Sequence, residues 1–139
     1  KITAILILLT GLSACSSMPV VKAYDDKKQP LNKVAQIRPT NGNTTYYPGI
    51  SRVVNISRNV TTPEWKNIGN HFTGHPSKMN LEPGRYKIQF YCTSGGYYSY
   101  PTAVIVVEAN KIYSTRCFNA EGGNVGVEVV EADRSSVKM

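Results

Sequence analysis

The sequence predicts an all-β fold, a small two-sheet antiparallel sandwich of about six to seven strands with one short helix. Three observations predict it. Apolar and polar residues alternate in short runs from residue 31 onward, which is the period of a half-buried strand. Glycine, proline and asparagine separate these runs, and two cysteines in the same region could join two sheets. We expect the sandwich over residues 31–131, after an N-terminal signal segment and a tether.

The chain opens with an apolar run that ends at Cys15. A secretory signal has about 7–15 apolar residues, whereas a bilayer-spanning helix needs about 20. We therefore interpret residues 1–14 as a signal peptide rather than a retained transmembrane helix. The sequence Leu12-Ser13-Ala14-Cys15 resembles the bacterial lipobox. This resemblance implies that Cys15 becomes the first residue after cleavage and carries fatty acids such as palmitate.

Residues 15–30 are predicted to be the lipidated cysteine and a flexible tether, because they mix small, charged and proline residues without a sustained apolar period. Cleavage after residue 14 would leave 125 residues, the size of one domain with a tether. The formal charge would fall from +7 to +6, since Lys1 is the only charged residue removed. This charge could favour anionic lipid headgroups and acidic wall polymers, but we interpret it first as a solvated basic surface that keeps the protein soluble. The basic residues are scattered and form no nucleic-acid-binding motif, so nucleic acid is not expected as a partner.

In the first half of the sandwich, the alternation over residues 31–37 predicts a strand that Pro39 ends. Asn, Gly and Asn at 41–43 predict a turn, and β-branched residues predict a second strand over 50–56. The short helix is expected over 62–69, where a threonine cap, a proline at the first helical position and an early glutamate precede a glycine.

In the second half, the strand at residues 85–92 follows a Pro-Gly turn and turns one apolar face to the core. That face consists of Tyr86, Ile88, Phe90 and Cys92. The next strand, 102–108, is apolar on both faces, which predicts a position at the centre of a sheet.

The last two strands are expected at 112–118 and 125–130. Asn110 and Lys111 predict a tight hairpin between strands 102–108 and 112–118, and a Gly-Gly turn precedes the final strand. Residues 132–139 are predicted to be a C-terminal tail.

After Cys15 is set aside, Cys92 and Cys117 remain, and an even number of cysteines in an exported chain predicts a disulfide rather than two free thiols. Closing their 25-residue separation would contribute about 3 kcal/mol. On either side of a central strand the two cysteines would lie about 9–10 Å apart, farther than the roughly 7 Å that bonded Cα atoms allow. Strands 85–92 and 112–118 are therefore either direct neighbours or members of two facing sheets.

A zinc site with His71 and His75 is the alternative use of the two cysteines. The segment between and after the histidines contains glycine and proline, which a ligand-bearing helix would avoid. We therefore predict that both histidines lie in a loop, and we expect neither a metal nor another cofactor.

The sequences Leu81-Glu82-Pro83-Gly84-Arg85-Tyr86-Lys87-Ile88 and Glu108-Ala109-Asn110-Lys111-Ile112-Tyr113 resemble the PEGA-type and transthyretin-like small sandwiches of bacterial envelope lipoproteins. The resemblance covers residues 31–131 by pattern, and 81–92 and 104–117 in detail, with Asn110 in place of a family glycine. It implies the same sandwich and an accessory or binding role in the envelope. By the family's sorting rules, Ser16 after the lipidated cysteine implies the outer membrane. We expect the domain to face the periplasm.

No catalytic motif is present: nucleophile-elbow, zinc-protease, phosphate-loop and dinucleotide patterns are all absent from the sequence. We therefore expect no catalytic residues and no enzyme activity. A recognition loop is predicted instead, because Tyr97, Tyr98 and Tyr100 follow two glycines, as in antibody paratopes. Tyr46 and Tyr47 form a second, smaller case. The alternative is that these rings fold back and complete the core.

These observations predict a lipid-anchored outer-membrane lipoprotein that acts as a non-enzymatic binding or assembly module in the cell envelope. Its partner would be the membrane through the anchor, together with an envelope protein or peptidoglycan; no oligomeric state is predicted. The alternative is an inhibitor of a cell-wall hydrolase, similar to the lysozyme-inhibitor lipoproteins. The charge of +6 disfavours it, because lysozymes are typically basic and would be repelled.

Overall fold

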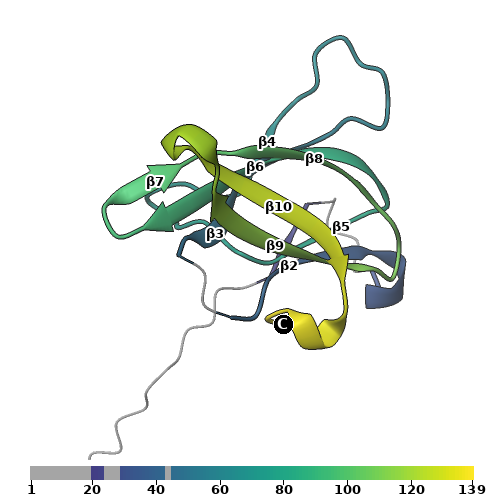
Figure 1. Ribbon diagram of the computed structural model, residues 1–139. Coiled ribbons are helices and arrows are strands. Elements are labelled where there is room, and N and C mark those ends of the chain that lie inside the picture. Colours follow the sequence, from purple (N-terminus) through teal and green to yellow (C-terminus); the bar gives the residue numbers. More distant parts are fainter. Residues whose placement is uncertain (1–19, 24–28, 43–44) are drawn as a thin grey trace, which may run out of the picture.

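The computed structural model describes residues 20–23, 29–42 and 45–139 (Figure 1). The predicted signal peptide, Cys15 and most of the predicted tether lie outside the described residues. The described residues form two five-stranded sheets that pack face to face, so the prediction of an all-β, two-sheet fold is confirmed. Among the helices of this described part, none has the length and apolar character needed to cross a membrane.

The strand order differs between the two sheets. The first sheet has the order β1 (Val21–Lys22), β5 (Met79–Leu81), β2 (Ala35–Pro39), β9 (Ile112–Asn119), β10 (Val125–Ala132). The second has the order β4 (Lys66–Asn67), β3 (Tyr47–Asn55), β6 (Gly84–Ser94), after which β7 (Tyr97–Ser99) and β8 (Thr102–Val107) both pair with the remaining side of β6. Three short 3-10 helices complete the described part: η1 (Leu31–Lys33), η2 (Glu121–Gly123), η3 (Arg134–Ser136).

The strand count and the strand directions differ from the prediction. Ten strands are present instead of six to seven, because strands of two or three residues, such as β1 and β5, are too short to show a period in sequence. The first sheet is mixed rather than antiparallel, since β1 pairs parallel to β5 and β2 pairs parallel to β9. The predicted strand at 31–37 begins as the 3-10 turn η1 and becomes β2 only from Ala35.

The short helix predicted over residues 62–69 is absent, and that prediction was wrong. Lys66 and Asn67 instead form β4, which pairs with Val53 and Arg52 of β3. A helix cap contributes only about 1 kcal/mol, and an isolated two-turn helix is marginal in water. Pairing with the edge of an existing sheet therefore determines the conformation of this segment.

Strand β8 lies at an edge, although its two apolar faces predicted a central position. It pairs only with β6, and Val104 and Val106 on its outer face are 53% and 62% exposed. Ile105 and Val107 on the inner face are buried. Apolar residues on both faces of a strand are therefore compatible with burial of one face only.

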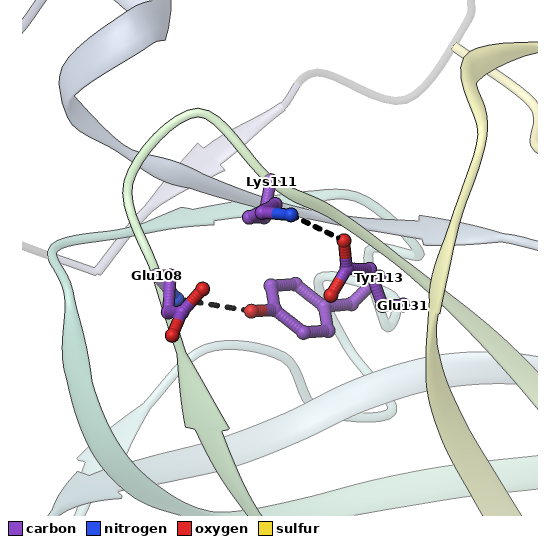
Figure 2. A network of polar contacts seen from close by, with 4 residues as sticks. All are labelled: Glu108, Lys111, Tyr113 and Glu131. Carbon is purple, nitrogen blue, oxygen red and sulfur yellow. Dashed lines mark hydrogen bonds and ion pairs between the residues drawn. The ribbon is translucent and has the colours of Figure 1, made fainter.

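The turn at Asn110 carries the chain from one sheet to the other, so the predicted hairpin between 102–108 and 112–118 is wrong. Asn110 has a positive φ of 62°, which asparagine tolerates better than most residues. The hydroxyl of Tyr113 accepts a hydrogen bond from the Glu108 backbone N–H at 3.0 Å, and Lys111 forms an ion pair with Glu131 at 2.6 Å (Figure 2). These contacts fix the crossing between β8 and β9.

The predicted disulfide is present and joins the two sheets. Cys92 on β6 is bonded to Cys117 on β9, with 6.0 Å between their Cα atoms. The facing-sheet alternative is thus the arrangement found. The predicted inward face of β6 is also confirmed, since all four of its residues are buried in the core: Tyr86, Ile88, Phe90, Cys92.

The segment predicted as a C-terminal tail lies against the first sheet (Figure 1). Val137 is buried and forms a β-bridge with Thr40. Close by, the Arg38 guanidinium is buried and donates hydrogen bonds to side-chain oxygens of Gln36 and Asn80, both at 3.0 Å. The outer face of this sheet is therefore partly covered by the chain itself.

Candidate functional site

The predicted recognition loop is a hairpin at one end of the second sheet, with β7 paired to the end of β6 (Figure 1). Tyr97 is 80% exposed and Tyr98 is 61% exposed, and Tyr100 is also classed among the exposed large side chains. The structure therefore places these three rings on the surface, and not in the core.

The second tyrosine pair is divided between core and surface. Tyr46 is partly buried and packs against the core, whereas Tyr47 is half exposed and its hydroxyl lies 3.5 Å from the hydroxyl of Ser77. Tyr46 also lines a small hollow with Tyr97 and Tyr98. Tyr98 and Tyr100 contact other aromatic rings, whereas Tyr97 is in none of the ring pairs of the described residues.

Tyr98 and Tyr100 belong to a group of five rings, which we call the aromatic cluster: His71, His75, Tyr91, Tyr98, Tyr100. His75 stacks on Tyr91 with 4.0 Å between ring centroids and 16° between planes. His71 meets Tyr91 edge-on at 5.6 Å, and its Nε2 shares a hydrogen bond of 2.8 Å with the Tyr100 hydroxyl. Three separate segments thus supply one continuous aromatic surface.

Two glycines allow the loop that carries the histidines to lie flat on β3. A Cβ at Gly49 would lie 2.5 Å from the Cβ of His75, and a Cβ at Gly69 would lie 2.6 Å from the backbone oxygen of Gly74. Both positions therefore need glycine for close packing. The histidines are loop residues, as the sequence predicted.

The turn that presents His71 is fixed by a side chain next to it. The Asn70 Oδ1 accepts hydrogen bonds from the backbone N–H groups of Phe72 at 2.8 Å and Thr73 at 3.0 Å. An asparagine that binds the backbone two residues ahead stabilises a tight turn. His71 is held toward the sheet at this turn, whereas Phe72 is fully exposed.

Beside the aromatic cluster lies a hollow of about 460 Å³ on the outer face of the second sheet, which we call the polar hollow. Six polar side chains line it together with the two histidines: Ser51, Arg52, Asn67, Asn70, Gln89, Tyr100. No carboxylate is among the lining residues. Arg52 and Gln89 are cross-strand partners on β3 and β6, so the sheet itself forms the floor.

Two ring pKa values in the cluster favour uncharged forms. Burial, followed by the proximity of His71, lowers the pKa of His75 below its ordinary value. Partial loss of solvent around its hydroxyl, followed by the proximity of Tyr91 and Tyr98, raises the pKa of Tyr100 although its ring is exposed. The His75 imidazole and the Tyr100 hydroxyl are therefore neutral at pH 7.

Arg52 is the cation of the polar hollow. Its guanidinium lies over the Trp65 ring, 4.5 Å from the centroid, in a cation–π contact. Its Nε is buried and has no hydrogen-bond partner in the described part of the chain. Both ion pairs found among the described residues involve β9, β10 or the turn before β9, so neither neutralises Arg52.

The alternative zinc site of histidines and cysteines is not formed. Cys92 and Cys117 are bonded to each other, and a disulfide sulfur is not available as a thiolate ligand. Across residues 20–23, 29–42 and 45–139, no group of three or more His, Cys, Asp or Glu side chains could hold a metal ion.

Sequence reasoning found Tyr98 and Tyr100 but missed Tyr91, the roles of both histidines, and Arg52. One signal for Tyr91 was available, because it alternates with the predicted core residues of strand 85–92 and must face outward. Nothing in the local sequence places His71 and His75 against that strand. Their packing depends on close approach at Gly49 and Gly69.

The comparisons with known proteins provide no relative to which this site can be compared. No protein-family model, curated protein or solved structure matches the chain. The function of the site is therefore argued from its own residues.

Proposed function

We propose that the protein is a lipid-anchored outer-membrane lipoprotein that acts as a non-enzymatic binding module of the cell envelope, with the aromatic cluster as its binding surface. The convergence of five rings from three segments on one exposed face carries this proposal. Tyrosine rings provide a large contact area at a low cost in conformational entropy. A surface of this composition suits recognition of a partner.

The lipid anchor is supported by the match of residues 12–15 to the lipobox. The resemblance to PEGA-type and transthyretin-like lipoproteins, and Ser16 after the cysteine, support the outer membrane and the periplasmic side. The test compares wild type with Cys15→Ala by palmitate labelling and membrane fractionation. Label that is lost on substitution, with wild type in the outer membrane, supports the anchor; a wild type without label contradicts it.

The chemistry of the cluster supports binding over catalysis. A catalytic tyrosine or histidine usually has its pKa moved toward the operating pH. Here the pKa of the Tyr100 hydroxyl is raised, so less of the hydroxyl is ionised at neutral pH. The pKa of His75 is lowered by burial, and its ring stacks on Tyr91, so the imidazole serves as part of an aromatic surface.

The binding surface is tested by affinity capture from detergent-solubilised envelope with the full chain as bait. We expect wild type and Tyr97→Ala to retain the same envelope component, and the double variant Tyr98→Ala/Tyr100→Ala to lose it. Tyr97 is the matched control because it is exposed and lies in the same hairpin, outside the aromatic cluster. Capture that is undiminished in the double variant would remove the aromatic cluster as the binding surface.

A further inference from the structure

We propose that the polar hollow binds a saccharide that carries a carboxylate, with the sugar ring against the aromatic cluster and the carboxylate at Arg52. This inference rests on the proposed function, since it names the ligand class of the same surface. The polar side chains of the hollow lie next to the aromatic cluster, and binding by the tyrosines alone assigns them no role.

The shape and lining of the polar hollow suit a sugar. Its volume of about 460 Å³ lies within the range of about 300–1,000 Å³ of small-molecule sites. Asn67, Gln89 and Ser51 make no side-chain hydrogen bond within the part of the chain that the structure describes. Amide and hydroxyl groups both donate and accept, as the hydroxyl groups of a sugar require.

The rings beside the hollow supply the other half of sugar recognition. A pyranose has an apolar face of C–H groups, and this face packs against neutral aromatic rings. Tyr100 and His75 border the hollow and both are neutral at pH 7, because loss of solvent raises the pKa of Tyr100 and lowers that of His75. A ligand that is apolar throughout would leave the amides of the hollow unsatisfied, which is costly.

The charge of the hollow selects an acidic ligand. The Arg52 guanidinium is positioned by its cation–π contact with Trp65, and no carboxylate lines the hollow. A planar guanidinium with free donors matches a carboxylate in a bidentate geometry. The Lys87 ammonium lies 6.0 Å from the centroid of the same Trp65 ring, but it does not line the hollow.

The test measures the affinity of matched sugar pairs by calorimetry with the full chain. One pair is the N-acetylglucosamine–N-acetylmuramic acid disaccharide and N,N′-diacetylchitobiose, which differ only in the lactyl ether group that carries the carboxylate. The other pair is cellobiouronic acid and cellobiose. We expect the acidic member of at least one pair to bind about tenfold more tightly than its neutral partner, because only the acidic sugar makes the charge-assisted contact with Arg52; tenfold corresponds to about 1.4 kcal/mol.

Variants locate the contact. Arg52→Gln should abolish the preference for the acidic sugar, and Lys87→Gln, the matched loss of one charge outside the hollow, should retain it. Tyr100→Phe keeps the ring and should weaken both members of a pair equally. Because Trp65 is the only tryptophan of the chain and contacts Arg52, a change in its emission on binding reports that the ligand occupies this hollow.

Three outcomes would overturn the proposal. The first is equal affinity within both pairs, and the second is lactate binding as tightly as the N-acetylmuramic acid disaccharide. The third is that protein with a native circular dichroism spectrum binds neither acidic sugar. The second would identify a simple anion site. None of these outcomes affects the capture experiment, because that experiment measures only whether Tyr98→Ala/Tyr100→Ala loses the envelope component that wild type retains. Loss of the sugar preference and loss of the binding function are therefore distinguishable.

Discussion

The imidazole of His75 lies between the ring of Tyr91, on which it stacks, and the edge of His71, 5.6 Å away between centroids. Burial removes water from the charged form of His75, and a second histidine nearby repels it, so the pKa of His75 is lowered. The stacked arrangement and the neutral charge state therefore support each other.

We predict that His71→Gln raises the pKa of His75 toward the ordinary value of about 6.5, because the substitution removes the second cause of the lowering while burial remains. NMR titration of the His75 ring protons measures it. Phe72→Ala is the control, since Phe72 is fully exposed on the same turn and its loss should leave the pKa of His75 unchanged. A pKa of His75 that stays constant or falls further in His71→Gln would contradict the assignment.

The sign of the effect on stability follows from the same shift. A histidine whose pKa is lower in the folded state contributes stability above about pH 6.5, and this contribution is lost as the pH falls through the folded-state pKa. The free energy of unfolding should therefore decrease as the pH falls from about 6.5 to the folded-state pKa of His75. The decrease should be smaller in His71→Gln, because the pKa of His75 then differs less between the folded and unfolded states.

Single residues of the site could be predicted only in part. Tyr98 and Tyr100 were found because glycine-flanked tyrosines in a turn are a local signal, and Tyr91 could have been found from alternation on β6. The contribution of Arg52 could not, because its contact with Trp65 was hidden by the prediction of a helix around Trp65. The partner that orients Arg52 became visible only with the correct local fold.

Among the elements, the loop of residues 69–75 depends on glycine in the strand beneath it. We predict that Gly49→Ala lowers the free energy of unfolding by about 1–3 kcal/mol, the usual cost of inserting a methyl group into a packed contact. The new Cβ would meet the Cβ of His75 at 2.5 Å and its backbone oxygen at 2.9 Å. Urea unfolding measures the stability, and the NMR shifts of the His75 ring should also move as the loop is displaced.

Gly96→Ala is the matched control for this change. A Cβ at Gly96 meets nothing within 4 Å, and its φ is not in the left-handed range. The substitution should be neutral or slightly stabilising, because alanine restricts the unfolded chain. Equal stabilities for Gly49→Ala and Gly96→Ala would show that the loop does not lie tightly on β3.

The edge position of β8 can be tested by comparing two adjacent valines, Val106 and Val107, which lie on opposite faces of the strand. Val106→Thr should change the free energy of unfolding by no more than about 0.5 kcal/mol, because Val106 lies on the exposed face. Val107→Thr should cost about 1–3 kcal/mol, because Val107 is 1% exposed and the hydroxyl would be buried in the core. If both cost the same in urea unfolding, β8 is covered on both faces, as a central strand would be.

The elements that sequence predicted best are those whose signal is local. The alternation on β6 and the turn before β10 depend on neighbouring residues, and both are present. The identity of the partner strand is not local. Val104 reads as buried in sequence but is exposed at an edge, and Lys66 pairs with Val53 although its surroundings carry helix signals.

For the whole molecule, the disulfide is the covalent link between the two sheets. The number of cysteines predicted a bond between Cys92 and Cys117, and the geometry of a meander left two arrangements open, neighbouring strands or facing sheets; the structure has the second. The parallel pairing of β2 with β9 was not predicted. It joins segments far apart in sequence, and no turn signal marks such a pair.

We predict that Cys92→Ala/Cys117→Ala lowers the free energy of unfolding by about 3 kcal/mol, because the unfolded chain is no longer constrained by the 25-residue closure. Replacing both cysteines avoids a free thiol, and urea unfolding of the oxidised wild type, the reduced wild type and the variant gives the comparison. The reduced wild type should resemble the variant. A variant as stable as the oxidised wild type would mean that packing alone holds the sheets together.

The same double variant tests whether the disulfide affects the binding site. Tyr91 lies between Phe90 and Cys92 on β6 but faces outward, so the aromatic cluster and the polar hollow are on the side of the second sheet away from the bond. Where the variant is folded, its affinity for the acidic disaccharide should therefore equal that of wild type. A loss of affinity without unfolding would mean that the spacing of the two sheets, and not only the outer face of β6, sets the geometry of the hollow.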